Sequence, residues 1–361
     1  MGASQYFASS YVEARQKFSD AATAAGARLF AESNEHARGP AGEALTTDLA
    51  WLGPAEAKRV LVTVSATHGA EGFCGAGVQT GTFLSGASRE LPRGSALLAV
   101  HAINPYGFAW VRRVTEDNVD LNRNFVSFAP PLPRNEDYDL LADAICPAEW
   151  TPSALAAAKA QLDAFGARHG AAALQRAITA GQYSHADGVF YGGAAPVWSH
   201  RTMLAIAKRH LAHAERVAVI DYHTGLGPYG HGERIVTHPA ASAAFSRARQ
   251  WYGDNITSTS LGTSRSSEIS GDLLLGLEEA LPQTEVTTMA LEYGVRPLDE
   301  TIDAVRADNW LHTRGRLDSP QGRDIKAMIR ATFYGDAGDW KDTIFEQALD
   351  AQRRALRGLA G

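Results

Sequence analysis

A histidine and a glutamate stand three positions apart just after an apolar run in the first third of the chain. Residues 61–65 have the composition of a buried strand, and Gly69 and Gly72 allow a sharp turn after it. On a helical turn, His68 and Glu71 share one face, and imidazole and carboxylate are both ordinary Zn²⁺ ligands. The pair predicts two ligands of a metal site, although a turn histidine beside a solvated glutamate explains it more simply.

Two later apolar runs end in residues of matching chemistry. Residues 215–222 lead into His223, which would be a third ligand. Residues 284–291 lead into Glu292, which has no Lys or Arg in the three positions before it and suits a general base beside a metal ion. Active sites of open α/β sheets lie at the carboxyl ends of strands. Three strand ends with matched chemistry therefore favour one metal-dependent site.

A fourth segment carries a resemblance to a known family. The strand-like residues 97–103 are followed by Asn-Pro-Tyr-Gly at 104–107, and residues 120–124 read Asp-Leu-Asn-Arg-Asn. This combination resembles the zinc carboxypeptidase family, in the clan that also holds aspartoacylase-like and succinylglutamate desuccinylase-like deacylases. Within the clan it is most similar to the bacterial group described as a domain of unknown function related to these carboxypeptidases. The likeness covers roughly residues 58–300, with the motifs in the family's order.

The resemblance implies a metal centre and its chemistry. It implies one Zn²⁺ per chain, bound by His68, Glu71 and His223. It also implies that Glu292 is the catalytic base and that the Asp120 carboxylate orients the imidazole of the first histidine, as metal-bound histidines require. Mn²⁺ or Co²⁺ would suit the same ligand types.

The resemblance also implies residues that contact substrate. Asn122 and Arg123 fall where the family holds the terminal carboxylate of its substrate, and a guanidinium suits that role because it can bind a carboxylate through two donors. The simpler interpretation is a surface arginine in a loop. Arg112 or Arg113 falls near the family's oxyanion-stabilising arginine; we choose Arg113 for that role and retain Arg112 as a substrate contact.

The family's pattern is incomplete between the third ligand and the catalytic glutamate. Zinc carboxypeptidases often place a mobile tyrosine there, and the candidates are Tyr229 and Tyr252. Neither lies in a recognisable motif, so neither is assigned. Side-chain specificity would reside in this region and in the insert that precedes it, and no motif there indicates the substrate.

A long insert separates the arginine motif from the third ligand. It contains Ala-rich helical sequence at 153–169 and 171–179, and then a Gly- and Tyr-rich loop at 181–193. His185 and Asp187 in this loop are alternative metal ligands. We interpret the loop as a folded segment near the cleft, because long ordered loops in compact domains are often functional.

The pattern along the chain predicts an α/β fold with a mixed, mostly parallel twisted sheet and helices on both faces. Expected strands lie near Val60, Leu97, Val217, Arg234 and Val286. Expected helices lie at 10–32, 202–213, 240–252, 298–312 and 341–359. We expect a single catalytic domain over 1–361, with a core at about 58–300, a helical insert at about 130–213 and helical additions at both ends.

The composition limits the classes of partner and the cellular compartment that we expect. The 361 residues are 45% hydrophobic and 20% charged, and the net charge of −6 argues against nucleic acid as a main partner. Cys74 and Cys146 do not form a metal-type pair. The first residues lack the basic start and apolar core of a secretory signal, and no apolar run approaches the roughly 20 residues that span a bilayer. We expect a cytoplasmic protein without a membrane partner; oligomeric state is not indicated.

Rival hydrolase and nucleotide-binding motifs are missing from the sequence. It has no Gly-x-Ser-x-Gly, no Gly-Lys-Ser/Thr and no His-Glu-x-x-His. We therefore expect a zinc-dependent amide hydrolase, carboxypeptidase-like, that acts on the carboxyl-terminal residue of a small peptide. The alternatives are an N-acyl amino acid deacylase with the same machinery and a catalytically inactive metal-binding protein.

Overall fold

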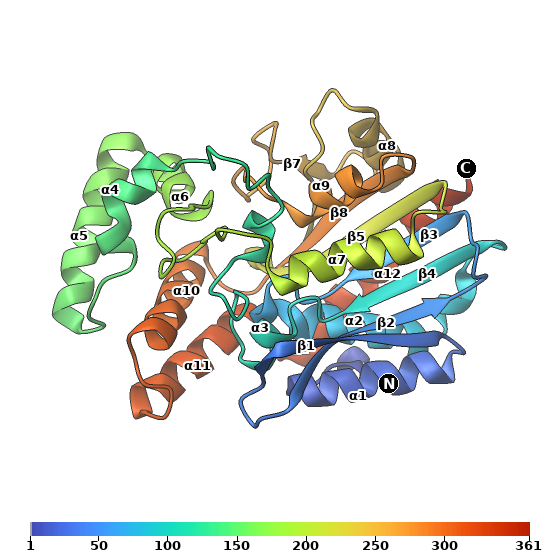
Figure 1. Ribbon diagram of the computed structural model, residues 1–361, viewed down its shortest axis with the longest axis horizontal. Helices are drawn as coiled ribbons and strands as arrows, with labels where there is room; N and C mark the ends of the chain where they lie inside the picture. Colours follow the sequence, from blue (N-terminus) through green and yellow to red (C-terminus); the bar gives the residue numbers. More distant parts are fainter. Residues whose placement is uncertain (1) are drawn as a thin grey trace.

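An eight-stranded mixed sheet forms the centre of the computed structural model, which describes residues 2–361 (Figure 1). The strand order is β1-β2-β4-β3-β5-β8-β6-β7. The strands are β1 (Arg28–Arg38), β2 (Ala44–Leu52), β3 (Arg59–Val64), β4 (Ser95–His101), β5 (Arg216–Tyr229), β6 (Gly232–Val236), β7 (Ile256–Ser258) and β8 (Glu285–Gly294). The four central strands β4, β3, β5 and β8 are parallel, and β2 and β6 flank them in antiparallel pairs. The prediction of a mixed, mostly parallel sheet is confirmed.

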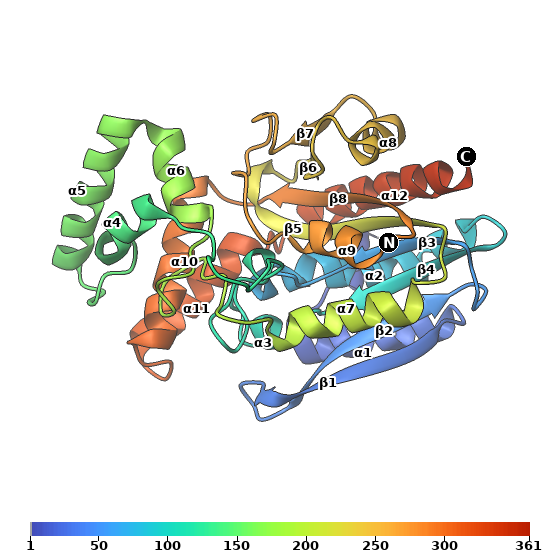
Figure 2. The same ribbon diagram turned by 45° about the horizontal axis from the view of Figure 1, so that its top comes forward.

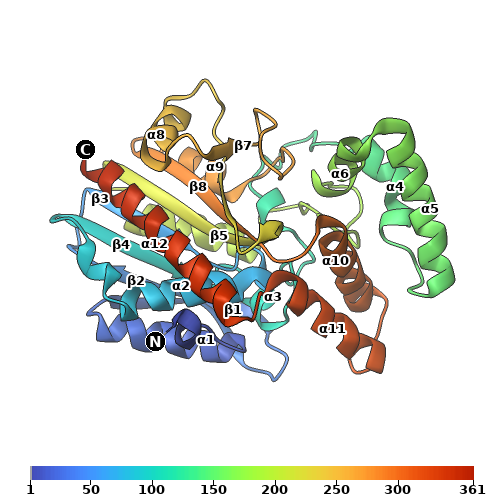
Figure 3. The same cartoon turned by 180° about the vertical axis from the view of Figure 1, so that it is seen from behind.

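Helices cover both faces of the sheet, as predicted (Figures 2 and 3). The α-helices are α1 (Tyr11–Ala24), α2 (Gly72–Leu84), α3 (Pro105–Ala109), α4 (Glu136–Ile145), α5 (Pro152–His169), α6 (Ala171–Thr179), α7 (Trp198–His210), α8 (Ala243–Tyr252), α9 (Leu273–Ala280), α10 (Leu298–Thr313), α11 (Pro320–Phe333) and α12 (Gly338–Ala360). Short 3₁₀ helices are η1 (Ala3–Tyr6), η2 (Gly69–Glu71), η3 (Ala87–Glu90) and η4 (Leu121–Arg123). Helices α1, α2, α8 and α12 share one hydrophobic core, and α7 and α9 share the other.

The apolar character of the central strands explains their position. Strand β4 is buried along its whole length, and β3 is buried from its second residue onward. Leu61 packs into one core, whereas Val60 and Val62 pack into the other. A strand that alternates between two buried faces needs helices on both sides, which is the arrangement of parallel sheets in α/β proteins.

The helix expected at 10–32 is wrong in its second half. Helix α1 begins after Ser10, whose hydroxyl accepts a hydrogen bond from the Glu13 amide, and it ends before Gly26 at φ +81°. A left-handed glycine commonly ends a helix. The following residues form the edge strand β1, which pairs with β2, and the sequence predicted neither strand. Strand β7 was missed as well, because it is only three residues long.

Helices α4, α5 and α6 form a lobe beside the end of the sheet, packed against α10 and α11 (Figure 1). The lobe has its own apolar contacts, with Tyr138, Leu162 and Phe165 buried near Val305 and Phe333. Helix α7, which the expected insert at 130–213 included, packs on the sheet instead. Within residues 2–361, no helix combines the length and apolar character needed to cross a membrane.

Candidate metal centre

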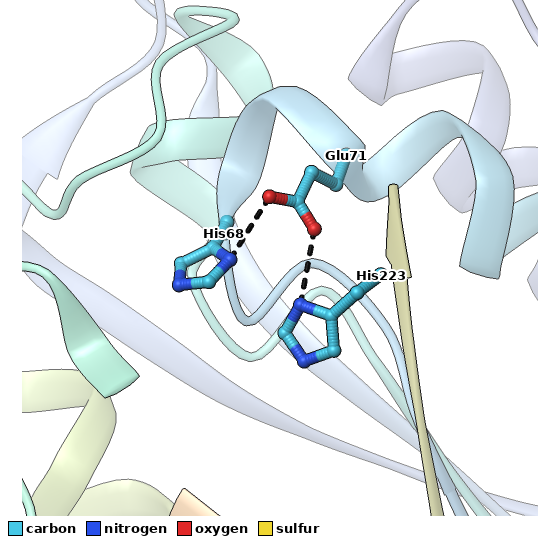
Figure 4. Close-up of side chains that lie close together, drawn as sticks. All are labelled: His68, Glu71 and His223. Carbon is cyan, nitrogen blue, oxygen red and sulfur yellow. Dashed lines mark hydrogen bonds and ion pairs between the residues drawn. The ribbon is translucent and has the colours of Figure 1, made fainter. Parts of the chain in front are cut away.

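Three side chains from the ends of β3 and β5 converge in the structure (Figure 4). One donor atom from each of His68, Glu71 and His223 can be chosen so that all lie within 4.8 Å of one another, and all three residues are buried. Strand register adds a fourth group, because His223 lies opposite Glu292 on the neighbouring parallel strand. The residues that the sequence proposed as ligands and base therefore lie together at one end of the sheet.

The turn that carries Glu71 is fixed by a close backbone contact. A Cβ on Gly69 would lie 1.9 Å from the carbonyl carbon of Gly107, so glycine is required there. The Gly69 and Ala70 amides donate to the carbonyls of Arg113 and Arg112 at 3.2 and 2.7 Å. These bonds hold η2 against the loop that carries the two arginines.

Each imidazole directs one nitrogen toward Glu71 and the other toward a buried aspartate. Nδ1 of His68 lies 2.9 Å from Oε1 of Glu71, and Nδ1 of His223 lies 3.0 Å from Oε2. Nε2 of His68 lies 3.1 Å from Asp120, and Nε2 of His223 lies 2.8 Å from Asp221. A carboxylate on Nε2 favours the tautomer that leaves Nδ1 free to bind a metal. Two nitrogens and one carboxylate fit a Zn²⁺ ion.

Sequence reasoning predicted the position of Asp120 but missed Asp221. The carboxylate of Asp221 is fully buried, and both its oxygens accept from the Thr67 hydroxyl at 2.9 Å. Its position two residues before His223 in one strand puts both side chains on the same face, and this spacing could have indicated it.

We expect Asp221→Asn to weaken metal binding by about 10- to 100-fold, because partners of this kind contribute that much to metal affinity. Competition with a chromophoric chelator would measure it. Asp308→Asn is the matched control, since that buried carboxylate pairs with Arg112 and Lys326 outside the cavity. Equal metal affinity in wild type and Asp221→Asn would show that Asp221 does not support the site.

Electrostatics within the cluster favour an ionised Glu71. Burial alone would raise the pKa of Glu71, but His68 and His223 outweigh burial, so the pKa lies below its usual value. Burial would likewise raise the pKa of Asp120, yet the neighbouring guanidinium groups of Arg113 and Arg123 hold it well below its usual range. Both carboxylates are therefore available as acceptors or ligands near neutral pH.

Glu292 behaves in the opposite way. Its side chain lines the same cavity, and Oε1 accepts a hydrogen bond from the Leu226 amide at 3.1 Å. Burial, followed by repulsion from Glu71, raises the pKa of Glu292 to about 8. Two nearby carboxylates with widely separated pKa values are typical of a catalytic site.

This raised pKa predicts a pH-dependent stability of the metal-free protein. Between the ordinary pKa of 4.5 and about 8, Glu292 stays protonated in the folded chain while the unfolded chain ionises. Stability should therefore fall as pH rises through this window, by up to about 1.4 kcal/mol per pH unit from this group. Burial lowers the pKa of His223, but Asp221 and Glu71 raise it overall, so this histidine also loses stabilisation as pH rises. Urea unfolding of wild type and of Glu292→Gln, both with a chelator and over a range of pH, separates the contribution of Glu292. The same pH dependence of the free energy of unfolding in both proteins would contradict the prediction.

The two adjacent arginines point in different directions. Arg113 lines the cavity, donates from Nε to Asp120 at 2.9 Å and from Nη1 to Glu71 at 3.3 Å. Arg112 instead donates from Nε to Asp308 at 3.1 Å, behind the loop. Arg113 therefore borders the candidate metal cluster, whereas Arg112 is not among the side chains that line this cavity, and its role as a substrate contact stays a prediction.

Asn122 and Arg123 both line the cavity, but Arg123 already has backbone partners. Its Nη1 donates to the carbonyl of Asn122 at 2.9 Å and its Nη2 to that of Thr179 at 2.5 Å. Oδ1 of Asn122 accepts from the Leu273 amide at 3.1 Å. These contacts hold both side chains in place in the cavity lining.

Phe190 is a cavity residue that sequence reasoning missed. Its ring lies 5.0 Å from the guanidinium carbon of Arg113 and 5.6 Å from that of Arg123, within reach of cation–π attraction. Its backbone has φ +54°, which is unusual for a residue other than glycine. The Gly-rich loop at 181–193 was the sequence feature that could have indicated it.

The remaining candidates lie away from the cavity. Nε2 of His185 is 2.9 Å from Asp139, and Asp187 pairs with Arg314, so the alternative ligands in the loop face other partners. Tyr252 is fully buried in the hydrophobic core that contains α8 and α12, and Tyr229 is exposed at the end of β5. Neither tyrosine lines the cavity.

The cavity has a volume of about 920 Å³, counted out to its open mouth. Residues at the strand ends and apolar side chains of α10 and α11 line it. The lining also includes hydroxyl and amide groups: Gln175, Thr179, Thr259, Ser266 and Ser267.

The sequence over residues 7–347 matches a family described as "Protein of unknown function (DUF2817)". The chain belongs to this family. The prediction that the chain belongs to a family described as a domain of unknown function is thereby confirmed. No protein of curated function matches the DUF2817 chain.

Solved structures with a similar fold include three proteins at low identity. Bovine thrombin-activatable fibrinolysis inhibitor, in complex with tick carboxypeptidase inhibitor, is 12% identical at a TM-score of 0.48, covering 98% of this chain and 97% of that chain. Carboxypeptidase A from Helicoverpa armigera is 12% identical at 0.45, covering 90% and 73%. An aspartoacylase family protein from Mesorhizobium loti is 14% identical at 0.38, covering 81% and 68%.

Proposed function

We propose that this DUF2817 protein is a zinc-dependent hydrolase of amide bonds that removes the carboxyl-terminal residue of a small peptide. The observation that supports this most strongly is the combination of three convergent donor atoms with a separate buried carboxylate in the same cavity. A protein that only binds a metal ion has no chemical need for Glu292 beside that cluster.

The residues divide the reaction between them. His68, Glu71 and His223 would hold the Zn²⁺, which would supply Lewis-acid chemistry to polarise the scissile carbonyl and acidify a water molecule. In its ionised form, Glu292 takes a proton from the water as the water oxygen bonds to the carbonyl carbon, and it returns this proton to the leaving amine as the amide C–N bond breaks. Arg113 is available to stabilise the negative charge that develops on the carbonyl oxygen.

Two further residues of the cavity lining orient the substrate. Asn122 and Arg123 hold the free carboxylate of the substrate, which places the adjacent amide bond over the floor of the cavity. Because both side chains are anchored by backbone hydrogen bonds, little ordering is needed when substrate binds.

Release of free amino acids from a mixed pool of short peptides and N-acyl amino acids tests this function. We expect release that stops when a chelator removes the metal and returns when Zn²⁺ is restored. Preferential release from peptides supports the carboxypeptidase, and preferential release from acyl amino acids supports the deacylase. No release from either class by zinc-loaded protein contradicts the proposed hydrolase.

A further inference from the structure

Two segments far apart in the sequence join across one side of the cavity. The first is the end of α6. The second is the connection between β7 and α9, residues 259–271, which we call the wall segment; it lies beside α6 (Figure 3). The Gln175 side chain donates to the carbonyl of Arg265 at 2.9 Å, and the Thr179 hydroxyl donates to the Ser267 hydroxyl at 3.2 Å. Gln175, Thr179 and Ser267 all line the cavity.

The contact between α6 and the wall segment, which we call the junction, is anchored on both sides. At the end of α6, the carbonyl of Thr179 accepts from Arg123 at 2.5 Å. The wall segment is held by Glu233, whose Oε1 accepts from the Ser264 hydroxyl at 2.9 Å and from the Arg265 amide at 3.1 Å. Glu233 itself lies opposite Glu292 in the β6–β8 register. The junction is therefore a fixed wall connected to the sheet on one side and to the insert lobe on the other.

The wall limits where a bound chain could leave the cavity. Residues at the strand ends and Leu298, Ile302 and Phe333 of α10 and α11 line the cavity together with Gln175, Thr179 and Ser267. An extended peptide advances about 3.3 Å per residue. A long peptide held by its terminal carboxylate would have to pass these lining side chains, whereas a dipeptide, tripeptide or acyl amino acid would be short enough to lie among them.

We propose that the junction of α6 with the wall segment restricts the enzyme to short substrates and excludes the ends of long polypeptides. This inference rests on the proposed function, because it concerns the substrate of the same site. Side chains of the insert thus determine substrate length, which assigns a role to the lobe formed by α4, α5 and α6.

A substrate series of increasing length with one constant carboxyl-terminal residue tests the proposal. Its members are an N-acetyl amino acid, a dipeptide, a tripeptide and a long unstructured peptide. We expect wild type to favour the best short substrate over the long peptide by at least about tenfold in kcat/KM. The double variant Gln175→Ala/Ser267→Ala removes one side-chain partner from each of the two hydrogen bonds. It should reduce the ratio of kcat/KM between the best short substrate and the long peptide at least about threefold.

The matched control removes side chains of the same two segments that face solvent. Arg176 and Ser270 are exposed on α6 and the wall segment, so Arg176→Ala/Ser270→Ala should keep the wild-type length preference. Equal kcat/KM for short and long peptides in wild type would overturn the proposal while leaving the hydrolase intact. An unchanged preference in Gln175→Ala/Ser267→Ala would equally overturn the role of the junction.

A labelling measurement keeps the length restriction testable without activity. Ile302 lines the cavity, so Ile302→Cys provides a thiol there, with the unsubstituted chain as the blank. We expect N-ethylmaleimide to react with it and a maleimide carried on a long peptide to react much more slowly, until Gln175→Ala/Ser267→Ala admits the larger reagent. If the larger reagent labels slowly but no substrate is hydrolysed, the proposed function is wrong while the restriction on length still stands. Equally fast labelling by both reagents in the wild-type background would overturn the restriction.

Discussion

Replacing Glu292 by glutamine should abolish turnover while the metal remains bound. The amide keeps the size of the side chain and an oxygen that can accept from the Leu226 amide, but it cannot take a proton from water. General-base catalysis typically contributes about 10²- to 10⁴-fold, so we expect a loss of that order in kcat. Steady-state kinetics and metal analysis on the same preparation would measure both effects.

Glu285→Gln is the matched control for this substitution. Glu285 begins the same strand at its other end, where it pairs with Arg216 and Arg247 at the surface. Its replacement should leave kcat and metal content unchanged. Turnover near the wild-type level in Glu292→Gln would show that another group is the base, and loss of the metal would show that Glu292 acts as a ligand.

Replacing Arg113 by methionine should lower kcat by about 10²- to 10³-fold, the usual cost of removing one donor to a developing oxyanion. Zinc must be saturating in the assay, because Arg113 also contacts Asp120 and its loss can weaken metal binding. Arg112→Met is the matched control. Its guanidinium pairs with Asp308 outside the cavity, so its replacement should lower the free energy of unfolding and not kcat.

The comparison of the two variants decides between neighbouring residues that sequence could not separate. A large loss of kcat in Arg112→Met with little loss in Arg113→Met would contradict the arrangement described above. The sequence did not decide between Arg112 and Arg113, because the direction of each side chain depends on the conformation of the loop that carries them. The bonds from the Gly69 and Ala70 amides to this loop, together with the ion pairs of each arginine, determine which side chain enters the cavity.

Sequence alone predicted the grouping of the candidate site because each main residue follows a strong local pattern. His68, His223 and Glu292 each stand at the end of an apolar strand, and parallel register then brings those ends together. Asp221 was missed because an aspartate inside an apolar strand was interpreted only as part of the strand. Phe190 was missed because it contacts two arginines that are distant from it in sequence.

The errors in the fold have a similar cause. Local helical spacing continued past Gly26, and only pairing with β2 shows that the following residues form an edge strand. The helices of the insert were predicted from local composition, but their packing against α10 and α11 and the contact of α6 with the wall segment depend on long-range contacts. Such contacts have no local sequence pattern.

Metal content of purified wild type and His68→Ala tests the central claim most directly. His238→Ala is the matched control, because that buried histidine contacts Thr288 and Glu278 away from the cavity. After supply of zinc and removal of the excess, we expect one zinc per chain in wild type and in His238→Ala, and a loss of zinc in His68→Ala. Wild-type protein that binds no metal under these conditions would contradict the claim.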